Sequence, residues 1–203
     1  ERYDETYSYS SDGRLTKEIY PEDKEISYSY ETNSPKGYVT KRTVTKKNES
    51  KNSVCEEIYT SETNYAYPTK VTARYTDSNG SEKTRVTQFT YDMLFGKPTS
   101  ATDDNGNVTY YEYDASGRLI KTVYPAYETY TSTKEKTKIL RVDTVKYTDM
   151  TAVSHPSYNS SYMPVVSRTE VNTVCYDITD TEYTDVKNID LTAAERLYSN
   201  YDI

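Results

Sequence analysis

The sequence predicts an all-β protein, a twisted, curved antiparallel sheet of successive β-hairpins, with a short C-terminal helix. Three observations lead to this prediction. The 203 residues include 25 tyrosines and 31 threonines, and aromatic and β-branched residues favour strands. Short runs in which Thr, Tyr or Val alternate with polar residues recur along the chain, and a period of two is typical of strands. Gly, Asn and Asp residues, which favour turns, separate these runs.

The alternating runs give the expected strands in chain order. The clearest of them are Glu25–Tyr30, Thr69–Tyr75, Arg85–Tyr91, Val108–Tyr113 and Val165–Val174. Asn79-Gly80 and Asn105-Gly106 each lie between two such runs. An Asn-Gly pair favours a type I′ turn, because both central residues of that turn take positive φ. Each pair therefore predicts a hairpin.

The C-terminal region departs from this pattern. Residues 191–198 contain Leu, Ala, Glu and Arg in place of β-branched residues, and these four favour helices. Thr192, followed three residues later by Glu195, has the spacing of a capping box. A short C-terminal helix is expected here.

Composition and charge exclude several classes of protein. The formal net charge is −7 and the basic residues are scattered, whereas a nucleic-acid surface needs a positive cluster; we expect no nucleic-acid partner. The chain has no apolar run near the ~20 residues of a membrane span. It also opens without a signal-peptide pattern, as expected for a mature or excised fragment.

Two cysteines, Cys55 and Cys175, lie 120 residues apart without a Cys or His neighbour at metal-ligand spacing. This spacing rules out a zinc site. Two interpretations stay open, namely two unpaired thiols or a single disulfide in an exported chain.

An internal repeat connects two distant parts of the chain. Residues 7–21 and 111–125 are identical at eight of fifteen positions without a gap. In the second copy, we expect Asp114 to accept hydrogen bonds from the turn and Gly117 to take the left-handed conformation. The first copy has Ser10 in place of Asp114, so Ser10 or Asp12 is expected to cap its turn.

The run from Tyr91 to Leu119 contains Tyr-Asp-x-x-x-Gly, then Asp-Asn-Gly-Asn-Val-Thr, then Tyr-Asp-Ala-Ser-Gly-Arg-Leu. This run resembles the YD repeats of the Rhs family, which occur in bacterial Rhs polymorphic toxins, in the B and C components of Tc insecticidal toxins and in teneurins. The resemblance is clearest over residues 65–125 and 3–30, and residues 126–203 are diverged. We expect residues 1–203 to form a single array of YD-repeat-like hairpins.

The resemblance implies a fold and a context. In the family, many hairpins form a shell that encloses a C-terminal toxin domain, or an extended wall. A chain of this length is expected to be one arc of such a shell. Its expected partners are the rest of the same polypeptide, namely further YD repeats and an encapsulated C-terminal domain, and its expected location is secreted or at the cell surface. The sequence has no Asp-Pro pair, so the family's aspartyl self-cleavage motif is not supported.

No catalytic, cofactor-binding or metal-binding residue is predicted. His155, the sole histidine, precedes a proline and is interpreted as part of a surface loop. Asp103 and Asp104 precede Asn105-Gly106 and are interpreted as turn-capping residues. The expected function is a non-catalytic structural fragment of a shell. The alternative is a surface β-module that binds glycans or a protein partner through a face rich in Tyr and Thr, since aromatic rings stack on sugars. The competing interpretation of the tyrosines is that their rings pack across strands and their hydroxyls are solvated.

Overall fold

The computed structural model describes residues 4–32, 37–48, 51–130, 133–152, 165–179 and 195–200. It divides into two compact units, Glu1–Asn107 and Val108–Ile203. The all-β prediction is confirmed, because these residues form antiparallel strands joined by turns. The one helical element among them is a 3₁₀ turn, η1, at Ser61–Thr63. None of the described helical segments has the length and apolar character needed to cross a membrane.

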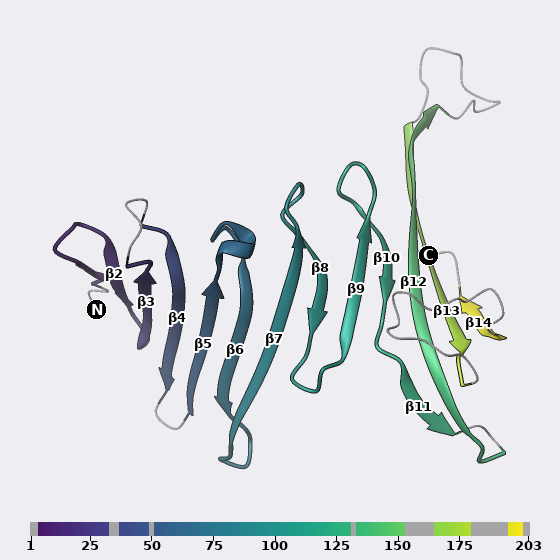
Figure 1. Ribbon diagram of the computed structural model, residues 1–203, viewed down its shortest axis with the longest axis horizontal. Coiled ribbons are helices and arrows are strands. Elements are labelled where there is room, and N and C mark those ends of the chain that lie inside the picture. Colours follow the sequence, from purple (N-terminus) through teal and green to yellow (C-terminus); the bar gives the residue numbers. More distant parts are fainter. Residues whose placement is uncertain are drawn as a thin grey trace. The chain divides into compact units, whose positions relative to one another are not determined.

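In the first unit, each strand pairs antiparallel with the next strand along the chain (Figure 1). Consecutive hairpins are therefore its only sheet connections among the described residues. The strands are β1 (Thr6–Tyr9), β2 (Leu15–Tyr20), β3 (Lys24–Tyr30), β4 (Val39–Asn48), β5 (Lys51–Tyr59), β6 (Pro68–Thr76), β7 (Glu82–Asp92) and β8 (Lys97–Thr102).

The second unit is built around one long strand. β12 (Lys136–Ala152) pairs on one side with β13 (Val165–Asp177), which in turn pairs with β14 (Glu195–Asn200). On its other side, β12 pairs first with β11 (Tyr127–Tyr130) and further along with β10 (Leu119–Val123). β9 (Val108–Tyr113) completes the order by pairing with β10.

Three turns share one five-residue structure that begins with Asp77, Asp103 or Asp114. In each, one oxygen of the aspartate carboxylate accepts the backbone N–H groups of the second and fourth residues that follow, at 2.8–3.0 Å. The glycine three residues after the aspartate has φ between +74° and +81° and donates its N–H to the aspartate carbonyl. The predicted roles of Asp114 and Gly117 are confirmed.

The first repeat builds the same turn with a serine. The Ser10 hydroxyl accepts the Arg14 N–H at 3.1 Å, and Gly13 has φ +83°. Ser10 is therefore the backbone cap, whereas Asp12 pairs with the Arg14 guanidinium.

The predicted type I′ geometry is wrong at Asn79-Gly80 and Asn105-Gly106, although both turns lie where they were expected. Neither asparagine is among the described residues with positive φ. The physical reason is the aspartate two residues before each asparagine. Its carboxylate bonds hold a type I turn that is followed by a glycine bulge, the same geometry as at Gly117.

The predicted C-terminal helix is also wrong where the structure describes it. Glu195–Asn200 form β14, which pairs antiparallel with β13 and places Tyr198 opposite Cys175; Thr192 lies outside the described residues. A helix of this length is marginal without tertiary support. The edge of β13 offers a row of backbone partners, and this pairing outweighs helix propensity.

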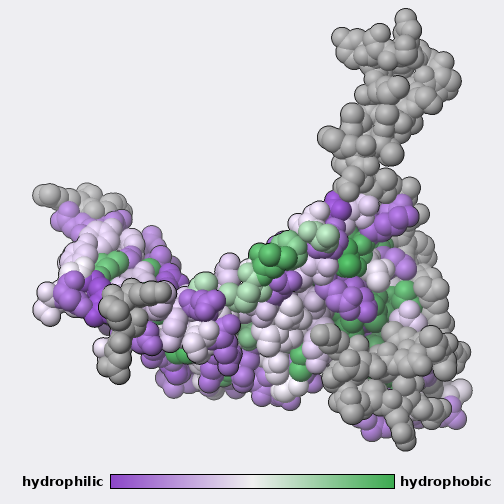
Figure 2. Space-filling view, turned by 45° about the horizontal axis from the view of Figure 1, so that its top comes forward, coloured by the Kyte–Doolittle hydropathy of each residue, from purple (hydrophilic) through white to green (hydrophobic). Residues whose placement is uncertain are grey.

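The two units bury their side chains differently. In the first unit, Ile26 is the only buried hydrophobic residue among those described, and its other buried side chains are polar. The second unit has a compact core of Val123, Leu140, Val142 and Ile178. Figure 2 shows that hydrophilic residues cover most of the visible described surface, with small hydrophobic patches.

We expect Asp114→Ala to lower the free energy of unfolding, as the loss of a helix N-cap does. The variant leaves the N–H groups of Ser116 and Arg118 without the carboxylate acceptor. Urea unfolding of the 203-residue chain measures the loss. Ser116→Ala keeps the backbone donor and is the control, so an equal loss in both variants would contradict this account of the turn.

Candidate functional site

The first unit presents two faces of different chemistry. Strand pairing places Ile58, Lys70, Gln88 and Thr102 in one row across β5 to β8. We call the face that carries this row the groove face. Charged side chains elsewhere on it pair across strands: Lys17 lies 2.9 Å from Glu25, and Glu56 binds both Lys41 and Arg74. The opposite face, which we call the tyrosine face, carries Tyr28, Glu57, Tyr59 and Tyr91. These residues lie at strand positions that alternate with those of the groove face, so their side chains point the other way.

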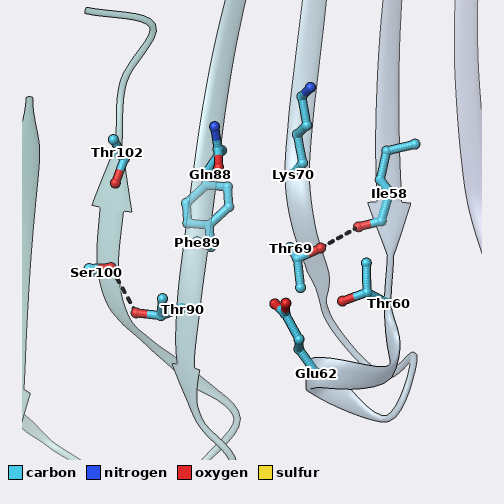
Figure 3. Close-up of a pocket in the computed structure, with 10 residues that line it drawn as sticks. All are labelled: Ile58, Thr60, Glu62, Thr69, Lys70, Gln88, Phe89, Thr90, Ser100 and Thr102. Atoms are coloured by element: carbon cyan, nitrogen blue, oxygen red, sulfur yellow. Dashed lines mark hydrogen bonds between the residues drawn. The ribbon is translucent and has the colours of Figure 1, made fainter. Parts of the chain in front are cut away.

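A groove of about 380 Å³ lies in the first unit at the β5 to β8 end of the groove face. Most of the side chains that line it are hydroxyl-bearing, amide or charged (Figure 3). The lining residues are Ile58, Thr60, Glu62, Thr69, Lys70, Gln88, Phe89, Thr90, Ser100 and Thr102.

Hydrogen bonds fix part of the groove wall. The hydroxyls of Thr90 and Ser100 lie 2.7 Å apart, and the Thr69 hydroxyl donates to the Ile58 carbonyl at 3.4 Å. The Thr60 hydroxyl oxygen is buried and has no hydrogen-bond partner in the described structure. A buried hydroxyl without a partner is costly, so this end of the groove has an unused hydrogen-bonding group.

The tyrosine face is held by bonds between phenol hydroxyls and carboxylates. Tyr28 donates to Glu18 at 2.8 Å, and Tyr59 donates to Glu57 at 2.8 Å. Glu57 also accepts from the Arg42 guanidinium at 3.1 Å. Burial, together with the bond to Glu57, raises the pKa of Tyr59 to about 12. These hydroxyls therefore bond to protein carboxylates and not to solvent alone, and the acceptor comes from the neighbouring strand for Tyr28 and from the same strand for Tyr59.

One further contact recurs in both units and extends the internal repeat. The Arg14 guanidinium lies 5.1 Å from the centre of the Tyr30 ring, and the Tyr30 hydroxyl donates to the Leu15 carbonyl at 2.5 Å. In the second unit, Arg118 lies 4.6 Å from the Tyr147 ring, and Tyr147 donates to the Leu119 carbonyl at 2.9 Å.

This contact explains the shared Arg-Leu pair of the two copies. The arginine covers a tyrosine ring of a later strand, and the leucine backbone accepts that tyrosine's hydroxyl. Sequence comparison missed the two tyrosines because Tyr30 and Tyr147 stand at different distances from their Arg-Leu pairs. The signal that could have found them is a tyrosine in a strand that follows each pair.

The structure places the other sequence candidates as follows. Asp103 caps its turn, and its side chain also accepts a bond from the Asn107 amide at 2.9 Å. These bonds lower the pKa of Asp103. His155 lies outside the described residues. Cys55 and Cys175 are free thiols. Within the described ranges, no group of His, Cys, Asp and Glu is arranged to hold a metal ion.

We expect acid to destabilise the first unit. Pairing with Lys41 and Arg74 lowers the pKa of Glu56, and bonds from Tyr20 and Tyr28 lower the pKa of Glu18. A carboxylate with a lowered folded-state pKa contributes stability above its unfolded pKa and loses it as the pH falls. The unfolding midpoint should therefore drop as the pH falls below the ordinary glutamate value of 4.5.

The matched variant is Glu56→Gln, which should be less stable near pH 6 and should lose less stability on acidification. Thermal unfolding followed by circular dichroism between pH 6 and pH 3 measures both slopes. Parallel slopes for the two proteins would contradict the role of Glu56.

Comparison with known proteins identifies residues 94–129 as a match to the RHS repeat family, which confirms the predicted resemblance for that segment. No curated protein sequence matches the chain significantly. Among solved structures, the chain is similar to a Photorhabdus luminescens Tc holotoxin pore carrying a mutation in TccC3, with 13% identity over 95% of this chain and a TM-score of 0.28. It is also similar to TcdB2-TccC3 without the hypervariable C-terminal region, with 14% identity over 91% of this chain and a TM-score of 0.27. The chain spans 11% of the length of each of these structures.

Proposed function

Because residues 94–129 match the RHS repeat, we propose that residues 1–203 act as a non-catalytic wall segment of an Rhs-type shell. The observation that carries this proposal is the recurrence of one hairpin turn, with an aspartate or serine cap and a glycine, at Ser10, Asp77, Asp103 and Asp114. In this role the chain is a single array of repeats that belongs to a longer exported toxin or cell-surface protein.

The way the first unit is stabilised supports a wall role. Its described strands pair with their chain neighbours, and it buries a single hydrophobic residue among those described. Charged and hydroxyl side chains connect the strands on both faces, as in the Lys41–Glu56–Arg74 cluster. A lone hairpin is marginal in water, whereas a repeat array gains stability from each added neighbour. Such a sheet can be extended by repeats at either edge.

The proposed partners are the rest of the same polypeptide, namely further YD repeats and a C-terminal domain that the shell encloses. The segment itself carries out no reaction in this proposal. Its contribution is mechanical, because it separates the enclosed domain from the surroundings until release.

The sequence of the complete gene tests this proposal first. We expect further Tyr-Asp-x-x-Gly-Arg units on the flanks of this segment and a variable domain at the C-terminus. In limited proteolysis of the full polypeptide, that domain should be cut only after the repeats have been unfolded. A gene without flanking repeats, or a C-terminal domain cut while the repeats remain folded, would overturn the proposal.

A second candidate function is a surface module that binds glycans. The groove on the groove face, with its hydroxyl and amide side chains, favours it. The tyrosines that suggested this function from sequence lie largely on the other face, so the groove residues would have to carry it.

A further inference from the structure

The groove is lined by several polar side chains that have no partner in the described structure. Away from the groove, Lys17, Lys41 and Arg74 each bind a glutamate. At the groove, the side chains of Lys70, Gln88 and Glu62 are exposed and make no hydrogen bond or ion pair with the described residues. Lys47 and Glu82 on the same face also have no partner among the described residues, so the groove is distinguished by unpaired polar side chains that line one hollow.

Strand register brings two of these side chains together. Lys70 and Gln88 are directly opposite each other on β6 and β7, and Thr102 is opposite Gln88 on β8. Directly opposite side chains on one face have Cβ atoms about 4.5–5.5 Å apart. The sheet therefore holds the Cβ atoms of these three residues in a row across three strands, from which the ammonium, the amide and the hydroxyl can each reach a ligand.

The chemistry of the groove selects one class of ligand. Lys70 and Glu62 carry opposite charges, so the lining residues have no net charge to attract a strongly anionic or cationic group. Gln88 and the hydroxyls of Thr90, Ser100 and Thr102 can donate as well as accept. Ile58 supplies the one aliphatic side chain of the lining. A ligand that both donates and accepts at many positions, as a sugar does, matches these groups.

The size of the groove also suits a small ligand. The volume of about 380 Å³ lies within the range of about 300–1,000 Å³ that is common for small-molecule sites. The buried Thr60 hydroxyl without a partner lies at the end of the groove next to Glu62. Because this oxygen is fully buried, a ligand would pair with it only after the groove wall shifts, so the proposal does not depend on it.

We propose that the groove between β5 and β8 is a binding site for a short neutral saccharide, with Lys70 and Gln88 as its main hydrogen-bonding residues. Phe89 also lines the groove, but its ring lies 6.2 Å from the Tyr91 ring and its strand position alternates with that of Gln88, so we assign it no hydrogen-bonding role. This site does not depend on the wall role, since the groove lies wholly in the first unit.

A glycan array probed with the 203-residue chain tests the proposal. The array carries neutral, sialylated and sulfated oligosaccharides, and the best neutral oligosaccharide is then titrated in solution. We expect neutral saccharides to bind, and Lys70→Ala and Gln88→Ala to weaken that binding roughly tenfold each, the effect of losing about one hydrogen bond. Lys17→Ala, on the same face but away from the groove, is the matched control and should leave binding unchanged.

Circular dichroism checks that the variants keep their strands, as expected for exposed side chains. Three results would overturn the proposal. They are no binding to any neutral saccharide, binding confined to sulfated or sialylated glycans, and neutral binding that Lys70→Ala and Gln88→Ala leave unchanged. None of these results bears on the wall role, which rests on the repeats.

Discussion

Gly96→Ala should lower the free energy of unfolding by about 2–4 kcal/mol, one of the largest effects of any single methyl group in this chain. Gly96 has φ +65°, a conformation that costs a residue with a Cβ about 1–2 kcal/mol. A Cβ at this position would also lie 2.5 Å from Cζ of Tyr67 and closer still to its hydroxyl oxygen. The Tyr67 ring cannot move freely away, because it stacks on Tyr91 with the ring centres 5.2 Å apart.

Gly80→Ala separates the two causes. Gly80 has φ +78°, but a Cβ there would meet no atom within 4 Å. This control should therefore show the conformational cost alone, about 1–2 kcal/mol. In a Tyr67→Ala background, the penalty of Gly96→Ala should fall toward that of Gly80→Ala. Equal losses for Gly96→Ala and Gly80→Ala in the parent chain, measured by urea unfolding, would show that the Tyr67 ring yields without cost.

Leu140→Ala should destabilise the second unit by about 2–5 kcal/mol. Leu140 is fully buried, and it packs with Val123, Val142 and Ile178 in the core of that unit. Removing its side chain leaves a cavity between strands that backbone hydrogen bonds hold in place, so the walls cannot collapse fully. The cost therefore includes both lost burial and lost packing contacts.

Hydrogen exchange of the backbone amides locates the effect of Leu140→Ala. Protection should fall in β10, β12 and β13, the strands that pair around Leu140. Val44→Ala is the comparison in the first unit. Because Val44 is only half-buried, we expect a smaller loss. A loss below that of Val44→Ala would mean that the second unit does not depend on its core.

The sequence predicted the strands and turn positions well because both depend on local chemistry. An Asp-x-x-Gly or Ser-x-x-Gly segment forms only a few kinds of turn. Alternating Thr and Tyr residues fit a pleated strand. The type I′ prediction failed because it considered the Asn-Gly pair alone and omitted the aspartate two residues earlier. The helix prediction failed for Glu195–Tyr198 because local propensity contains no information about the free edge of β13.

The candidate site could be predicted only in part. Strand alternation could have shown that Gln88 and Lys70 occupy one face, but their pairing depends on the register between β6 and β7. Whether Lys70 and Gln88 find a hydrogen-bond partner depends on which side chains the neighbouring strands place opposite them. The contact of Arg118, the residue before β10, with Tyr147 on β12 spans the chain segment that forms β11. Contacts over such separations are set by the fold and have no sequence signature of fixed spacing.

The order and register of the consecutive hairpins define the first unit, and oxidative cross-linking to the native Cys55 tests both. Cys55 on β5 is opposite Val44 on β4 and Ala73 on β6, and directly opposite residues are close enough for a disulfide. In a Cys175→Ala background, Val44→Cys and Ala73→Cys should each be tested for an internal disulfide by mass spectrometry. At least one of them should form it, whereas Arg74→Cys, which points to the other face, should not. A disulfide in Arg74→Cys alone, or none in any of the three variants, would contradict the strip of consecutive hairpins.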